Sequence, residues 1–159
     1  MNIHEYQAKE ILSQFGVTIP KGGIAYSPEN AKDRASELGG EIWVVKAQIH
    51  SGARGKAGGI LVCKSLQEVS DAANNLLGKK LVTNQTGPEG KVVQRIYVEE
   101  GTDIKKEFYL GLVFDRSTES IMVVASSAGG MSVEEIAKEK PDSIIRSKIE
   151  VAVGIQSFQ

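Results

Sequence analysis

Residues 42–63, IWVVKAQIHSGARGKAGGILVC, set a glycine-rich, basic loop between two apolar runs. The first run, residues 42–47, is rich in branched and aromatic side chains and predicts a mostly buried strand. Residues 60–63 predict a second strand, so the loop joins two strands. Four glycines within residues 52–59 let the backbone approach a ligand closely and present its N–H groups.

The same loop carries permanent positive charge. Arg54 and Lys56 lie within it, and Lys46 on the preceding strand can reach a phosphate from the side. Polyphosphate is an anion that needs this combination of flexible amides and fixed cations. The loop therefore predicts a phosphate site, although its spacing is neither that of a Walker A loop nor that of a Rossmann fingerprint. An ordinary basic turn is the alternative interpretation.

The sequence before the loop predicts two helices and a strand. Asn2 and Glu5 have the spacing of an N-cap and its N3 partner, for a helix that Gly16 ends. A strand is expected at residues 22–26, followed by a capped helix over residues 27–38. The apolar face of the first helix is expected to consist of Ala8, Ile11, Leu12 and Phe15.

The sequence after the loop continues the alternation of strands and short capped helices. Ser65 and Glu68 predict the start of a helix over residues 65–77. Ser132 is expected to cap a shorter helix that ends before Pro141. The further strands are expected at residues 81–83 and 92–99, in a hairpin at 107–125, and at 143–151. This alternation indicates an α+β fold of packed layers.

Overall composition excludes several classes of function. The 159 residues carry 19 Lys and Arg against 20 Asp and Glu, a net charge of −1, which argues against general nucleic-acid binding. No apolar stretch approaches the ~20 residues needed to cross a bilayer, which argues against a membrane protein. The opening residues show no targeting pattern. We therefore expect a cytoplasmic protein.

Few residues are suited to metal or nucleophilic chemistry. Cys63, the single cysteine, lies in an apolar run and is expected to be a small buried strand residue. His50 has no partner nearby in the sequence and is expected to be a structural loop residue, whereas His4 is expected at the surface or an interface. Two isolated histidines without a supporting ligand set argue against a metal site.

A second candidate segment, residues 98–107 (VEEGTDIKKE), links two predicted strands. One interpretation is a hinge between two lobes, where backbone amides contact a base. Hydroxyl donors need a carboxylate acceptor, so Glu107 at the start of a strand suits a ribose. The alternative is a solvated turn of mixed charge.

Several motifs together resemble the β subunits of ADP-forming succinyl-CoA synthetase, and the resemblance covers essentially the whole chain. They are MNIHEYQAK (1–9), WVVK (43–46), RGKAGG (54–59), LGKKLVT (77–83), EFYLG (107–111) and DR (115–116). The resemblance implies an ATP-grasp fold, in which nucleotide is held between two lobes. The first lobe is expected at about residues 20–100, and residues 101–159 are expected to begin the second.

The resemblance also implies a site for ATP or ADP. By this resemblance, Lys46 contacts the phosphate, and Ala53, Arg54 and Gly55 cover it. Glu99 and Thr102 line the adenine end of the site, and Glu107 binds the ribose. Family members often have glycine where this chain has Ala53, and a methyl group is tolerable there only if φ is negative. Pro20 and Ala53 favour a user of ATP over a user of GTP.

In the complete family enzyme, a phosphohistidine on the α subunit passes a phosphoryl group between nucleotide and succinate. The net reaction interconverts succinate, CoA and ATP with succinyl-CoA, ADP and phosphate. The family's Mg²⁺ ligands and CoA-ligase domain lie beyond Gln159, so we expect no metal site and no catalytic residue in this chain. We expect a truncated chain that binds nucleotide weakly, if at all, and does not turn over alone.

Two alternatives stay open. Residues 51–55 (SGARG) also resemble malate–CoA ligase β subunits, and the acid substrate is expected to bind outside this part of the enzyme. The second alternative is a non-catalytic module that docks on a partner and binds either nucleotide or no ligand.

Overall fold

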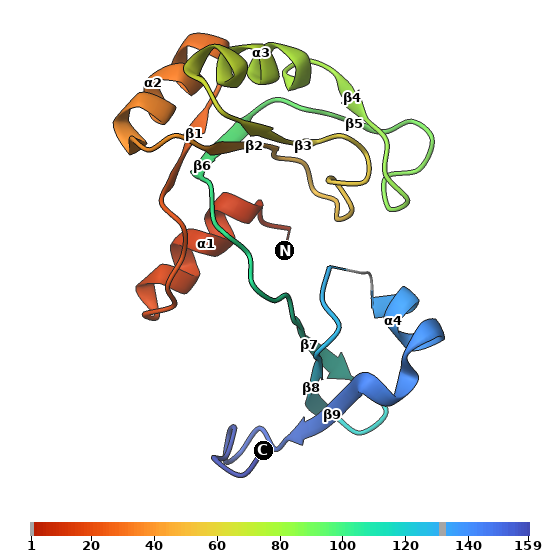
Figure 1. Cartoon of the computed structure of the whole chain (residues 1–159). Coiled ribbons are helices and arrows are strands. Elements are labelled where there is room, and N and C mark those ends of the chain that lie inside the picture. Colours follow the sequence, from red (N-terminus) through yellow and green to blue (C-terminus); the bar gives the residue numbers. More distant parts are fainter. Residues whose placement is uncertain (1, 131–132) are drawn as a thin grey trace. The chain divides into compact units, whose positions relative to one another are not determined.

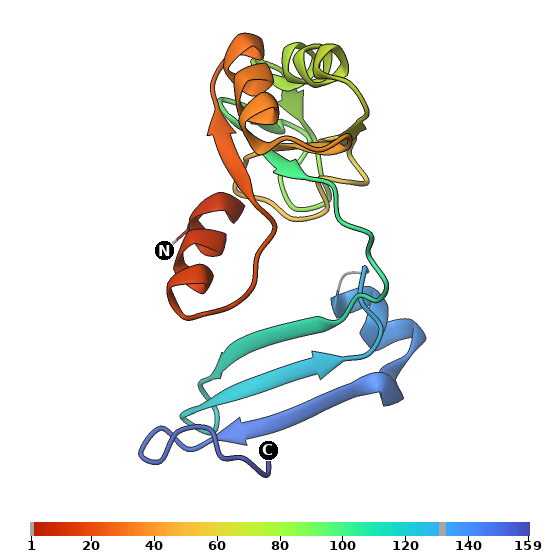
Figure 2. The same cartoon turned by 60° about the vertical axis from the view of Figure 1, so that its left-hand side comes forward.

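The computed structural model describes residues 2–130 and 133–159, and it divides into two compact units, Met1–Thr102 and Asp103–Gln159. The first unit is built on a four-stranded antiparallel sheet with the order β1-β6-β2-β3 (Figures 1 and 2). Its strands are β1 (Gly22–Ala25), β6 (Ile96–Glu100), β2 (Trp43–Ala47) and β3 (Ile60–Cys63). The predicted strands on both sides of the glycine-rich loop are confirmed, and they pair with each other.

Two helices, α2 (Pro28–Leu38) and α3 (Leu66–Leu76), cover one face of this sheet (Figure 1). Both begin at the predicted N-caps. Ser27 Oγ accepts a hydrogen bond from the Asn30 N–H at 3.1 Å, and Ser65 Oγ accepts one from the Glu68 N–H, also at 3.1 Å. These bonds satisfy amides that the first turn of a helix leaves without a partner.

The core lies between these helices and the sheet. Alternate residues of β2, namely Trp43, Val45 and Ala47, are buried there together with Ile96 and Val98 of β6. Because successive side chains of a strand point to opposite faces, the residues between them belong to the other face. That second face carries Val44, Lys46, Tyr97 and Glu99.

The first helix, α1 (Glu5–Gln14), lies on this second face (Figure 1). Gly16 follows it with φ +78°, as predicted, but the predicted N-cap at Asn2 is wrong, because the helix begins after His4. The His4 N–H donates to Gln7 Oε1 at 2.9 Å, which places the cap two residues later. The apolar residues expected to share one face do not enter the core, since no residue of α1 is buried and Phe15 is 82% exposed.

The strand predicted at residues 92–99 forms two strands instead of one. Lys91–Val92 (β5) pairs with Lys80–Leu81 (β4) in a separate two-stranded sheet, and only β6 joins the main sheet. Between them the Val93 N–H donates to the Lys79 carbonyl at 2.9 Å. This bond to a distant segment turns the chain out of the first sheet before it enters the second.

The second unit holds a three-stranded antiparallel sheet of β7 (Tyr109–Asp115), β8 (Ser120–Ser126) and β9 (Ile144–Ile149). The predicted hairpin is confirmed, and the Asp115 carboxylate holds its turn by accepting the Ser117 N–H at 2.9 Å. α4 (Val133–Glu139) and a 3₁₀ turn (Pro141–Ser143) connect β8 to β9. The predicted cap Ser132 lies outside the described residues. No described helix has the length and apolar character needed to cross a membrane.

Candidate functional site

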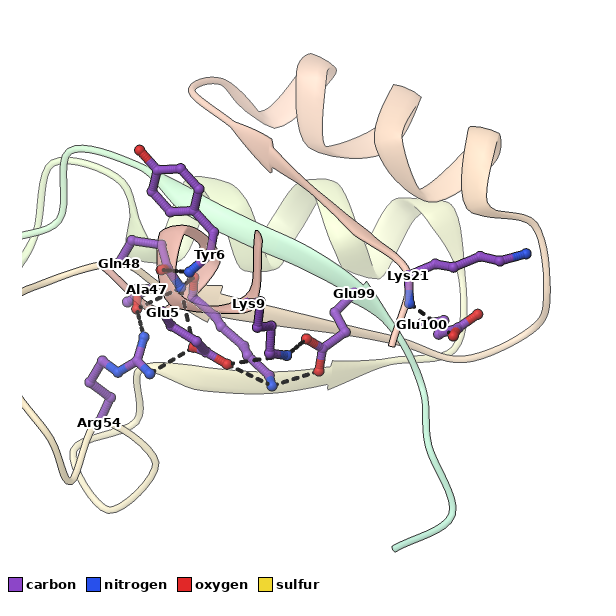
Figure 3. A network of polar contacts seen from close by, with 10 residues as sticks. Glu5, Tyr6, Lys9, Lys21, Ala47, Gln48, Arg54, Glu99 and Glu100 are labelled. Atoms are coloured by element: carbon purple, nitrogen blue, oxygen red, sulfur yellow. Dashed lines mark hydrogen bonds and ion pairs between the residues drawn. The ribbon is translucent and has the colours of Figure 1, made fainter. Parts of the chain in front are cut away.

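Three cations meet two carboxylates on the second face of the first unit's sheet (Figure 3). Lys46 Nζ lies 2.6 Å from Glu99 Oε1 and 3.2 Å from Glu5 Oε1. Arg54 Nη2 lies 2.7 Å from Glu5 Oε2. Lys9 pairs with both carboxylates, at 3.4 Å from Glu5. Three positive charges against two negative ones leave the cluster with an excess positive charge.

Two elements bring these residues together. On the sheet, Lys46 is paired with Tyr97, so Glu99 is its diagonal neighbour on the same face. On α1, Glu5 and Lys9 are one helical turn apart and therefore share a side of the helix. The buried Gln48 ties the two elements, since its Oε1 accepts the Tyr6 N–H at 3.3 Å.

The surroundings of Glu5 and Lys46 favour the charged form of each. Burial alone would raise the pKa of Glu5, but the charges of Lys46, Arg54 and Lys9 outweigh it and lower that pKa from 4.5 to about 2. Burial alone would lower the pKa of Lys46, but its hydrogen bond to Glu99 and the charges of Glu5 and Glu99 raise it above 10.5. At neutral pH Lys46 is therefore positively charged and Glu5 negatively charged.

The glycine-rich loop turns back onto the end of β2. Arg54 Nη1 donates to the Ala47 carbonyl at 2.6 Å, and the Gly59 N–H donates to the Arg54 carbonyl at 2.7 Å. Within the described residues, the N–H groups of Ala53, Arg54 and Gly55 have no hydrogen-bond acceptor. Three successive amides are thus available to an anion beside the Arg54 guanidinium.

Ala53 adopts φ +57°. The negative φ that we expected to be necessary for a methyl group at this position is therefore not observed. This is the left-handed region, where a Cβ approaches the backbone closely and which glycine adopts at little cost. The loop therefore keeps a glycine-like conformation with alanine in it.

The structure brings together some of the predicted site residues. Lys46, Arg54 and Glu99 belong to one cluster, and Ala53 and Gly55 flank Arg54 in the loop. Thr102 is exposed at the carboxyl end of the first unit, and Glu107 is exposed in the second unit.

Sequence reasoning missed Glu5, Lys9 and Gln48 as members of the cluster. The available signal was the spacing of four residues between Glu5 and Lys9, which places an acid and a base on one helix face. Glu5 was assigned only to capping, and nothing local in the sequence relates α1 to β2.

His50 has a partner far away in the sequence. Its ring stacks on that of His4, with ring centroids 4.0 Å apart and planes 16° apart. The two histidines that sequence reasoning treated as unrelated therefore form one pair, at the amino-terminal end of α1.

Comparison with known proteins gives consistent matches. A family model described as an ATP-grasp domain matches residues 2–159. A probable malate–CoA ligase subunit β from Mesorhizobium japonicum is 57% identical over 100% of the chain. The ADP-forming succinate–CoA ligase subunit β from Nautilia profundicola is 56% identical over 99% of it. The chain spans 40% of the length of each of these relatives.

Solved structures show the same fold at lower identity. ATP citrate lyase from Methanothrix soehngenii, in complex with citrate and coenzyme A, matches 97% of the chain and 36% of its own, with TM-score 0.65 and 21% identity. The dinucleotide-forming acetyl-coenzyme A synthetase 1 from Ca. Korarchaeum cryptofilum matches 98% of the chain and 71% of its own, with TM-score 0.59 and 20% identity.

Proposed function

Because this chain belongs to the ATP-grasp domain family, we propose that its first unit binds the phosphates of ATP or ADP. One observation carries the proposal: Lys46 from β2 and Arg54 from the glycine-rich loop, eight residues apart, converge on the Glu5 carboxylate. An anion placed where that carboxylate lies would contact both cations.

The charges of the cluster favour exchange of the Glu5 carboxylate for a polyphosphate. Glu5 and Glu99 together carry less negative charge than the three cations carry positive charge. A nucleotide phosphate chain brings more negative charge and more acceptor oxygens than either carboxylate. It can also accept hydrogen bonds from the free amides of residues 53–55, which the family resemblance predicts to cover the phosphate.

The remaining predicted contacts complete this proposal. By the family resemblance, Glu99 and Thr102 would line the adenine end; Glu99 lies two residues beyond Tyr97, the strand partner of Lys46, and Thr102 follows β6. Glu107, in the second unit, would accept the ribose hydroxyls. Phosphoryl transfer depends mainly on positioning and on charge stabilisation, and these residues supply both for the nucleotide.

For the whole protein, we propose the β subunit of an ADP-forming succinate–CoA ligase that works with an α subunit carrying a phosphohistidine. The resemblance of the motifs and the identity to such subunits support this. The substrates would be succinate, CoA and ATP, and the products succinyl-CoA, ADP and phosphate. Residues 1–159 would hold the nucleotide, and no catalytic residue is assigned among them.

The residues present do not fit a magnesium site. The two carboxylates of the cluster, Glu5 and Glu99, are both engaged by cations. In the part of the chain that the structure describes, no group of three or more His, Cys, Asp or Glu side chains is arranged to hold a metal ion. No step of the proposal therefore passes through a metal held by these residues.

Malate–CoA ligase is the second candidate for the whole protein, because a relative of that name is 57% identical over the full chain. The succinate–CoA ligase subunits are 53–56% identical, so overall similarity does not separate the two acids. Comparing succinate with malate as the acid that drives ADP formation in the complete α–β complex decides between them.

The nucleotide proposal is tested by calorimetric titration of the chain with ADP. We expect weak, saturable binding that Lys46→Ala weakens at least tenfold, because one of two converging cations is lost, with partial recovery in Lys46→Arg. The matched control is Lys32→Ala, which removes an exposed lysine of α2 and should leave the affinity unchanged. Equal affinity of wild type and Lys46→Ala would contradict the proposal.

A further inference from the structure

A basic pocket lies beyond the end of β2 that is remote from Glu99. It has a volume of about 310 Å³ and is lined by His4, Gln48, Ile49, His50, Lys91, Val92, Gln94 and Arg95. In the register of the sheet, Val44 faces Glu99 whereas Ala47 faces Ile96, so the pocket continues from the opposite end of the strand. None of its lining residues belongs to the proposed nucleotide contacts.

The positive charge of this pocket is not compensated by carboxylates. Lys91 and Arg95 both line it, and no acidic residue does. Among the described residues neither cation has an ion pair, and Arg95 instead lies over the Tyr26 ring, 6.0 Å from its centroid. Lys46 and Arg54, in contrast, each contact a carboxylate. An uncompensated pair of cations in a concave site attracts an anion.

The stacked histidines add donors to the same pocket. His4 Nδ1 is shielded from solvent and has no hydrogen bond of normal geometry within the described residues. A buried polar atom left in this way is unfavourable, and a ligand that bonds it removes that cost. Burial, and then the charges of His50, Arg95 and Arg54, hold the pKa of His4 below its usual 6.5. An anion beside the pair would reverse this effect by stabilising a protonated imidazole.

The position of His4 favours an anion for another reason. His4 is the N-cap of α1, a helix of ten residues, so the pocket lies at the positive end of that helix dipole. The helix dipole, the two cations and the histidine pair all favour the binding of an anion in this pocket.

We propose that this pocket is a binding site for a phosphate-class dianion, held by Lys91 and Arg95 with donors from Gln94 and the His4–His50 pair. A dianion fits better than a single carboxylate, because the two cations Lys91 and Arg95 exceed the charge of a monoanion. The Arg95 guanidinium can bond two oxygens of such a group at once. None of the four groups that would hold this anion, Lys91, Arg95, Gln94 and the His4–His50 pair, is a proposed nucleotide contact, although Gln48 borders both sites.

The chain provides its own reporter for the test, because it has two histidines and both line the pocket. The ring C–H signals of His4 and His50 are followed by NMR during titration with inorganic phosphate at pH 7 and constant ionic strength, with chloride as the competing salt. We expect saturable shifts of both rings with phosphate and none with chloride. The double variant K91Q/R95Q, and K91Q alone, should weaken the response at least tenfold and threefold, respectively.

The charge-matched control is K32Q/K64Q, which removes two exposed lysines away from the pocket and should retain the wild-type response. A non-saturable shift, or an equal loss in the control, would show ionic screening only and overturn the proposal. Loss of the response in Lys46→Ala but not in K91Q/R95Q would place the phosphate at the nucleotide cluster. That result would overturn the proposed phosphate site in the pocket and leave the nucleotide proposal intact. If ADP did not bind but phosphate still shifted both histidine signals, the nucleotide proposal would fail and the phosphate site would remain.

Discussion

At the scale of the residue, Ala53 shows how the glycine-rich loop stores strain. A φ of +57° costs an alanine about 1–2 kcal/mol in the folded chain. Glycine avoids this strain, but its greater conformational entropy in the unfolded chain lowers stability by about 0.5–1 kcal/mol. The first effect is the larger one. We therefore expect Ala53→Gly to raise the free energy of unfolding of the first unit by about 0.5–1 kcal/mol, measured by denaturant unfolding.

The matched control for this prediction is Ala57→Gly in the same loop. Ala57 does not have a positive φ, and it packs against the core. The substitution should therefore destabilise by about 1 kcal/mol. Destabilisation by Ala53→Gly of the same size as in the control would show that the methyl group at residue 53 is not strained.

At the scale of the element, the start of β7 depends on a close approach by Gly129. A Cβ added to Gly129 would lie 2.5 Å from the Phe108 backbone nitrogen and 2.6 Å from Glu107 Cβ. Backbone atoms cannot move away as a flexible side chain can. We expect Gly129→Ala to destabilise the second unit by about 2–3 kcal/mol, seen as faster amide hydrogen exchange in β7 and β8.

Gly154→Ala is the control for the clash at Gly129. Gly154 has φ +70° and no atom within 4 Å of an added Cβ, so it tests backbone strain alone, at about 1 kcal/mol. If both variants exchanged at the same rate in β7 and β8, the contact with residues 107–108 would not matter for the hairpin.

The elements that local signals specify could be predicted from the sequence. Ser27 and Ser65 begin helices because a hydroxyl three residues before an amide is sufficient to cap it, and both caps are present. The break after Val92 could not be predicted, because it depends on the bond from the Val93 N–H to the Lys79 carbonyl. The exposed apolar side of α1 has the same cause: its ionic partners lie on distant strands, and they decide which side of the helix faces the sheet.

At the scale of the whole molecule, acid should destabilise the first unit through Glu5. Its pKa is about 2 in the folded chain and ordinarily 4.5, so its contribution is fully present above pH 4.5 and is lost as the pH falls toward 2. The shift, from 4.5 to about 2, corresponds to about 3 kcal/mol. We expect Glu5→Gln to lose less stability than wild type between pH 5 and pH 2.5 in denaturant unfolding.

Glu10→Gln, on the same helix, is the control for this acid effect, because Glu10 is exposed and has no ion pair in the described part of the chain. It should follow the wild-type profile. An acid profile of Glu5→Gln that coincides with that of wild type would show that the cluster does not contribute to stability.

The candidate site as a whole could be predicted only in part. The loop and Lys46 were visible, because glycines and cations are close together in the sequence. The carboxylate on which they converge was not, because Glu5 is 41 residues from Lys46 and 49 from Arg54. Local spacing predicts which cations could bind an anion. Only the folded chain shows which carboxylates these cations pair with.

The mode of attachment of α1 has a consequence for how the chain would respond to a ligand. This helix buries no residue of its own and is held to the sheet by Glu5, Tyr6 and Lys9. On the proposed function, a phosphate chain that takes the place of Glu5 at Lys46 and Arg54 would remove these ionic attachments of α1 and leave the hydrophobic core intact. Loosening of the amino-terminal segment would then accompany nucleotide binding, and high salt would weaken the same attachments.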